Sequence, residues 1–263
     1  MLHGFPDHER SFDAQLPVLA AAGHRAVAVR MRGYEPSSQP EDGDYRPVCM
    51  AEDVLGWIDE LGAKKVHLVG HDWGSIIAQA AVAMAPERFA SLVLIAVPRL
   101  GPLGRLIRSD RRQFRRSLYG LFFQWRGISD WWVRRANFVY LERLWRRWSP
   151  GWKIADATLD GMKAVFAQPG VLGAALSYYR QSRDPVSARL LRTPIGVPAM
   201  GLYGARDGCI GADIFERAMP AADFPAGLSL HRIEEAGHFL HLEQADEVNM
   251  LLLRWLDARS DAA

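Results

Sequence analysis

The segment VGHDWG at residues 69–74 constrains the fold of this chain more than any other. It follows the apolar run 65–69, which predicts a buried strand, and it precedes residues 76–84, whose apolar surface nearly all round predicts an internal helix. Gly70 and Gly74 flank Asp72 at the spacing of a sharp strand-to-helix turn, which forces the central side chain into the open above a sheet. The alternative interpretation is an ordinary helix-capping aspartate.

An aspartate in such a turn limits the chemistry. Asp72 cannot form a conventional acyl-enzyme from an ester as a serine does, but its carboxylate can displace at an sp³ carbon and form an alkyl ester of the enzyme. The sequence therefore predicts Asp72 as a carboxylate nucleophile.

The rest of the chain predicts an α/β protein with a mostly parallel sheet. Apolar runs predict strands at 25–30, 65–69, 91–96, 199–203 and 228–233, and helical periodicity predicts helices at 48–61, 76–84 and 248–256. Strands separated by helices imply a parallel sheet covered on both faces. Residues 98–192 show helical periods without convincing strands, so we expect a core formed by 1–97 and 193–263 and a helical lid formed by 98–192.

The lid segment also differs from the core in charge. Between Arg99 and Arg192 there are 19 Lys and Arg against 6 Asp and Glu, and six of the nine tryptophans lie there. The favoured interpretation is a solvated arginine-rich face whose aliphatic stems cover tryptophan. A surface that holds an acidic ligand, a partner or a membrane is the alternative.

Composition excludes several other classes of protein. The net charge of +2 is too small to indicate nucleic acid binding, and Cys49 and Cys209 are too few for a disulfide framework or a cysteine-based metal site. No apolar run is long enough for a membrane span, and nothing before His3 could serve as a signal peptide. We expect a cytoplasmic protein that needs neither metal nor organic cofactor.

Two further loops complete a catalytic triad. Asp207 lies just beyond the strand 199–203, and His238 lies in a glycine-bearing turn, AGH, between the last strand and the last helix. The chain order of nucleophile, acid and histidine is the order that strand-turn-helix hydrolases use. All three residues are predicted at the carboxyl ends of strands, where parallel sheets place their sites.

The motif HGFP at residues 3–6 predicts an oxyanion site. The backbone N–H of Phe5 can point at developing negative charge together with the N–H of Trp73, which follows the nucleophile. A Gly-Pro turn without function is the alternative.

The chain resembles the epoxide hydrolases of the α/β-hydrolase fold and, more distantly, the haloalkane dehalogenases. The resemblance rests on the motifs HGFP, RGYEPS at residues 32–37, GHDWG and AGH, together with Asp207. The resemblance covers almost the whole chain. It departs at Glu35, where relatives usually carry a small residue, and at the start, where relatives have about two strands and most of a third before HGFP. We expect an in-frame, strand-like stretch upstream of Met1, or a truncated gene.

The resemblance also implies two lid tyrosines that hydrogen-bond the epoxide oxygen. The segments LYGLFFQ and LSYYR match the surroundings of these tyrosines, so we assign Tyr119 and Tyr179, with Tyr178 as the neighbour open to misassignment. Opening an epoxide produces an alkoxide, and a phenol can share its proton with that charge. Dehalogenases commonly have an Asn after His-Gly, whereas this chain has Phe5.

We therefore expect a small apolar epoxide as substrate and a vicinal diol as product. Asp72 attacks the less hindered epoxide carbon, and water activated by His238, oriented by Asp207, then hydrolyses the ester. Two alternatives stay open: a haloalkane or haloacid dehalogenase that uses the same Asp72, and a non-catalytic binding protein of this fold. The substrate, its stereochemistry and the oligomeric state, a homo-oligomer included, are not fixed by the sequence.

Overall fold

The computed structural model describes residues 1–259 and contains a four-stranded sheet in which all neighbours are parallel. The strands lie in the order β1, β2, β3, β4, with bounds Val66–His71, Phe89–Ile95, Ala199–Gly204 and Leu228–Ile233. Every residue of β2 and β3 is buried, whereas β4 is largely half-buried at the edge. The predicted α/β fold with a parallel sheet is confirmed.

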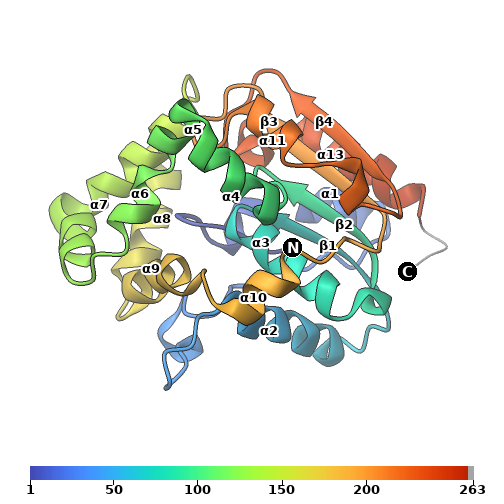
Figure 1. Ribbon diagram of the computed structural model, residues 1–263, viewed down its shortest axis with the longest axis horizontal. Coiled ribbons are helices and arrows are strands. Elements are labelled where there is room, and N and C mark those ends of the chain that lie inside the picture. Colours follow the sequence, from blue (N-terminus) through green and yellow to red (C-terminus); the bar gives the residue numbers. More distant parts are fainter. Residues whose placement is uncertain (260–263) are drawn as a thin grey trace.

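The two faces of the sheet bury separate apolar clusters. Side chains alternate along a strand, so Leu92 and Leu94 of β2 join the larger cluster, and Val93 and Ile95 join the smaller one. The larger cluster includes α2 and α3, and the smaller includes α13 (Figure 1). The helices of the core are α1 Leu16–Ala21, α2 Pro47–Glu60, α3 Trp73–Met84, α11 Ala212–Arg217, α12 Leu240–Glu243 and α13 Ala245–Asp257.

Between β2 and β3 the chain forms only helices. They are α4 Leu100–Ser109, α5 Arg111–Arg116, α6 Leu118–Phe122, α7 Ile128–Trp148, α8 Asp156–Ala167, α9 Val171–Gln181 and α10 Pro185–Leu190. Non-helical backbone at residues 135–138 interrupts α7. Figure 1 shows α6 and α7 at the opposite end of the molecule from α13. We call residues 98–192 the helical insertion.

The strand predicted at residues 25–30 does not form. Within the described residues it forms one parallel bridge, between Val29 and Leu2, and exchanges backbone hydrogen bonds with Met1, while Leu2 also bridges Gly70 of β1. Because only Met1 and Leu2 of the described residues pair with this segment, no continuous ladder forms along it. Leu2 still donates to Val69 O at 2.8 Å and accepts from His71 N at 2.9 Å, so it fixes the turn that follows it to the end of β1.

A cavity of about 340 Å³ lies beside β1 on this side of the sheet. Its lining includes Val29, Val66 and Trp57, and it touches none of the residues predicted to act in catalysis. No helix in residues 1–259 combines the length and apolarity needed to cross a membrane.

Candidate active site

Asp72 occupies a strained turn between β1 and α3. Its backbone has φ +50° and ψ −115°, a region that residues with a side chain rarely adopt outside functional sites. The turn is tight because a Cβ on Gly74 would lie 2.2 Å from Leu2 O, and one on Gly70 would lie 2.3 Å from Gly74 O. The two glycines therefore permit the turn, and Asp72 is held at the carboxyl end of β1, only 4% exposed.

The backbone of the HGFP turn contacts the Asp72 carboxylate directly. Phe5 N donates to Asp72 Oδ1 at 2.8 Å. A Cβ on Gly4 would lie 2.4 Å from Asp72 Cβ, so only glycine allows this approach. Trp73 begins α3, where the first N–H groups of a helix have no partner within the helix. Phe5 N, one of the two N–H groups predicted as an oxyanion site, therefore contacts Asp72, and the other, Trp73 N, follows Asp72 directly in the chain.

His238 lies between two carboxylates. Its Nδ1 is 2.9 Å from Asp207 Oδ2, and its Nε2 is 3.4 Å from Asp72 Oδ2. Asp207 Oδ1 accepts from the backbone N–H groups of Cys209 and Ile210 at 2.6 and 2.9 Å, so the loop after β3 fixes this carboxylate. The structure brings together Asp72, Asp207 and His238, which are far apart in the sequence.

The two carboxylates control the protonation of His238. Burial by itself lowers the pKa of a histidine, but Asp207 and then Asp72 outweigh burial and raise the pKa of His238 to about 10. His238 is therefore an imidazolium at neutral pH.

This raised pKa predicts how stability depends on pH. Below about pH 6.5 His238 is protonated in the folded and in the unfolded state, so it makes its full contribution to the free energy of unfolding. As the pH rises toward about 10, the folded state holds a proton that the unfolded state has lost, so the contribution disappears. Urea unfolding at pH 7, 8 and 9 should show a decline that is steeper in the wild type than in His238→Gln, by up to about 1.4 kcal/mol per pH unit. Parallel declines in the two proteins would contradict the assigned charge state.

Tyr119 and Tyr179 come from α6 and α9 of the helical insertion and meet over the core. Their rings lie 5.8 Å apart, and the ring of Tyr179 lies 5.0 Å from Trp73 and 5.3 Å from Phe5. Burial raises the pKa of both phenols well above 10, and the charge of Asp72 adds to this effect. Both phenols therefore keep their protons at neutral pH.

The hydroxyls of these two tyrosines differ in their partners. Tyr119 Oη lies 3.4 Å from Cys209 Sγ, whereas Tyr179 Oη is buried with no hydrogen-bond partner among residues 1–259. The neighbouring Tyr178 donates to Arg32 O at 2.6 Å, so its hydroxyl is engaged elsewhere. Of the pair in α9, Tyr179 is the residue that presents an available hydroxyl beside Trp73.

Comparison with known proteins agrees with this geometry. The family model for the alpha/beta hydrolase fold matches residues 1–245. The chain belongs to this family. It is 29% identical to Epoxide hydrolase 4 of Homo sapiens over 97% of this chain and 71% of that protein. It is also 29% identical to the epoxide hydrolase of Caballeronia sordidicola, over 97% of this chain and 85% of that one.

Solved structures give the same family. The epoxide hydrolase of Bacillus megaterium, solved with an inhibitor, superposes with a TM-score of 0.83 at 26% identity, over 97% of this chain and 92% of that one. An epoxide hydrolase from an endophytic Streptomyces superposes with a TM-score of 0.79 at 29% identity, over 99% of this chain and 89% of that one. The chain is an α/β-hydrolase similar to epoxide hydrolases.

This α/β-hydrolase holds its catalytic loops with residues that the sequence analysis missed. Trp148 O, at the end of α7, accepts from Gly208 N at 2.9 Å and from His238 N at 3.1 Å, so one carbonyl links the loops of Asp207 and His238. Ser149 Oγ also accepts from His238 N, at 3.0 Å, and it donates to Glu243 at 2.6 Å. The only related sequence signal was the turn SPG at residues 149–151, which indicates the end of a helix but not the contacts that Trp148 and Ser149 make.

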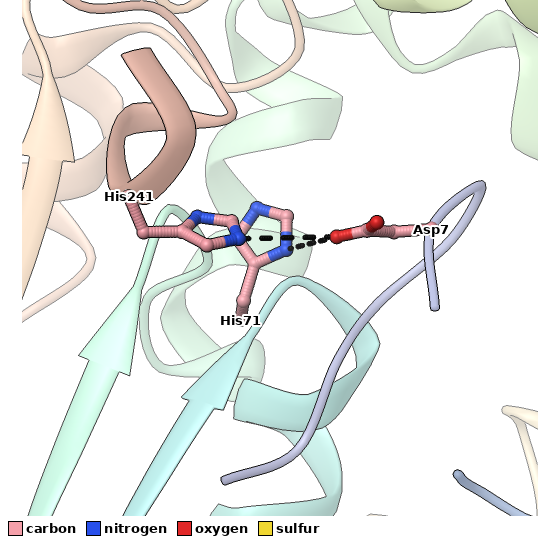
Figure 2. Close-up of side chains that lie close together, drawn as sticks. All are labelled: Asp7, His71 and His241. Atoms are coloured by element: carbon pink, nitrogen blue, oxygen red, sulfur yellow. Dashed lines mark ion pairs between the residues drawn. The ribbon is translucent and has the colours of Figure 1, made fainter. Parts of the chain in front are cut away.

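Asp7, His71 and His241 form a buried cluster (Figure 2). His71 Nε2 is 3.1 Å from His238 O, which can only accept, so Nε2 carries a proton. His71 Nδ1 and His241 Nε2 face Asp7 Oδ2 at 3.6 and 3.9 Å. The three donor atoms lie within 4.8 Å of one another, a set that could hold a divalent ion such as Zn²⁺. No step of the reaction proposed below passes through them.

Proposed function

We propose that this enzyme opens small apolar epoxides to vicinal diols through an alkyl ester on Asp72. The observation that carries the proposal is the placement of Asp72, with Oδ1 bound to Phe5 N and Oδ2 beside His238 Nε2. This arrangement gives the two carboxylate oxygens different roles. Oδ2 attacks, and Oδ1 becomes the carbonyl oxygen that the backbone N–H groups of Phe5 and Trp73 stabilise.

The first step forms the ester. Asp72 Oδ2 bonds to the less hindered epoxide carbon, the bond from that carbon to the ring oxygen breaks, and the oxygen takes a proton from Tyr119 or Tyr179. Both phenols carry protons to give, because burial raises the pKa of each well above 10.

The second step hydrolyses the ester. Esterification removes the negative charge of Asp72, which is one of the two charges that raise the pKa of His238. The imidazolium therefore becomes more acidic after the first step and can return its proton to the tyrosinate. Neutral His238, oriented by Asp207, then takes a proton from water, and the hydroxide attacks the ester carbonyl. When the tetrahedral intermediate collapses, the departing alkoxide takes a proton from the His238 imidazolium and leaves as the diol. The Asp72 carboxyl group then gives its proton to the imidazole, which regenerates the carboxylate and the imidazolium.

Epoxides fit this site better than haloalkanes. Phe5 occupies the position where dehalogenases commonly place a halide-binding Asn, and the two partly buried phenols suit an alkoxide leaving group. A variant of the Bacillus megaterium relative, at 26% identity and a TM-score of 0.84, was solved with its product (R)-3-[1]naphthyloxy-propane-1,2-diol. A vicinal diol is the product that we propose for this chain.

A substrate panel tests the proposal. Purified protein is incubated with terminal and internal epoxides and, in parallel, with haloalkanes and haloacids, and diol and halide are measured. We expect diol formation from epoxides, and Asp72→Ala should reduce it by on the order of 10⁴-fold or more, because no other residue supplies the nucleophile. Halide release without diol formation would instead assign a dehalogenase, and equal turnover by Asp72→Ala would refute the assigned nucleophile.

A further inference from the structure

The outer face of the helical insertion exposes an apolar stripe. Seven of the nine large exposed apolar side chains in residues 1–259 lie between positions 114 and 132. They are Phe114, Leu118, Leu121, Trp125, Ile128, Trp131 and Trp132, which we call the apolar stripe. Trp125 is 63% exposed and Trp131 is 58% exposed, so large aromatic rings face solvent.

The members of the apolar stripe come from three successive helices and the turn before the last of them: α5, α6 and the start of α7. From Phe114 to Trp132, six of its members follow each other at alternating steps of four and three residues. In a globular protein apolar residues at such a spacing normally pack inward, but here α5, α6 and the start of α7 turn them outward. Large exposed apolar side chains gathered on neighbouring short helices are typical of an interaction site.

Positive charge surrounds the apolar stripe. Residues 105–135 contain nine arginines against two acidic residues, Asp110 and Asp130. Asp130 pairs with Arg180, and Asp110 caps α5 by accepting from Gln113 N at 2.7 Å. Few negative charges are therefore left to balance the arginines on this face.

Arginines of α5 also line a cleft between the insertion and the core. The cleft has a volume of about 870 Å³, and Arg112 and Arg116 of α5 line it together with Arg147, Arg206 and Arg232. The cleft lies between the insertion and the core, because Arg206 and Arg232 belong to the core, and α5 contributes both Phe114 of the apolar stripe and two arginines of the cleft.

We propose that the apolar stripe binds the surface of an anionic lipid bilayer, with tryptophans in the interface and arginines against the headgroups. Exposed Trp, Leu and Phe beside Arg are the composition of helices that lie in a membrane interface. Arg135 fits this arrangement, because its guanidinium stacks over Trp131 at 4.5 Å and Trp132 at 5.3 Å and so remains beside the apolar rings. A second copy of the chain fits less well, since a two-fold contact would oppose the same arginines.

Docking in this way places the active site close to the lipid. Leu118 and Leu121 of the apolar stripe flank Tyr119 on α6, so the helix that would touch the bilayer also supplies a proposed proton donor. An apolar substrate dissolved in the bilayer would then have a short path to Asp72. This consequence depends on the proposed function, whereas the binding itself does not.

Vesicle sedimentation tests the binding without any assay of activity. Phosphatidylcholine vesicles with and without about 30% phosphatidylserine are mixed with the tag-free protein at low and high salt. We expect binding to the anionic vesicles at low salt and much weaker binding to neutral vesicles or at high salt. The variant W125S/W131S should bind at least tenfold less well. Arg111→Gln and Arg115→Gln should each weaken binding about fivefold, the factor expected for one basic residue near an anionic surface.

Two controls keep the result unambiguous. Met250→Ser removes an exposed apolar side chain on α13, away from the insertion, and it should bind as the wild type does. Thermal unfolding followed by circular dichroism identifies any variant that fails to fold. The proposal is overturned if anionic vesicles do not bind the protein, or if W125S/W131S binds them as tightly as the wild type. It is equally overturned if light scattering shows a dimer that W125S/W131S dissociates while vesicles remain unbound.

Discussion

In the His238→Gln variant, the ester on Asp72 should form and then persist. Attack at carbon needs an ionised carboxylate and a polarised epoxide, and neither depends on the imidazole acting as a base. Hydrolysis of the ester needs a base to deprotonate water, and His238 is the residue placed for it, 3.4 Å from Asp72 and 2.9 Å from Asp207. Loss of a general base typically costs 10²–10⁴-fold in rate, so turnover should fall by about this factor.

Mass spectrometry can detect the trapped ester. The variant is incubated with the epoxides that the parent enzyme hydrolyses, and we expect the protein to gain one substrate mass on the peptide containing Asp72. His231→Gln is the matched control, because this histidine lies on β4 and contacts Ser229 at 2.8 Å, outside the site. It should turn over normally and carry no adduct. An adduct on another residue, or none despite turnover by the parent, would refute the Asp72 mechanism.

Much of this site could be predicted because its signals are local in the sequence. The turn around Asp72 needs glycines two residues before and two after the nucleophile, and both positions can be read from six residues. Asp207 and His238 could be placed because each follows a predicted strand, and parallel strands end at the same edge of a sheet. Local patterns were therefore sufficient for the residues closest to the chemistry.

The contacts that hold the site together could not be predicted in this way. Trp148 O joins the Asp207 and His238 loops only because α7 ends between them, and no pattern near Trp148 encodes that docking. The strand expected at 25–30 has suitable composition, but a strand also requires a partner along its length, and among the described residues only Met1 and Leu2 pair with it. Both features depend on tertiary structure rather than on local preference.

The two adjacent tyrosines of α9 were also ambiguous in the sequence. Neighbouring residues on a helix point about 100° apart, so the rotation of α9 decides which hydroxyl can serve the site. Tyr178 donates to Arg32 O, while Tyr179 Oη lacks a partner among the described residues. Because of this difference, Tyr178→Phe is a suitable control for Tyr179→Phe, only one residue away on the same helix.

Tyr119→Phe and Tyr179→Phe should each slow ester formation while leaving folding nearly unchanged. Each substitution removes one proton donor to the epoxide oxygen, a loss that typically costs about 10²-fold or more in rate, and the double variant should lose more than either alone. Stopped-flow measurement of ester formation separates this effect from hydrolysis, which uses His238 and should keep its rate.

Tyr178→Phe should show the opposite pattern. It loses the hydrogen bond to Arg32 O, which is worth about 1 kcal/mol of stability, but it keeps the rate of ester formation. If the double variant forms the ester at the wild-type rate, the phenols are not the proton donors. An enzyme that needs no proton on its leaving group would then fit better, and the dehalogenase reaction through Asp72 becomes the better assignment.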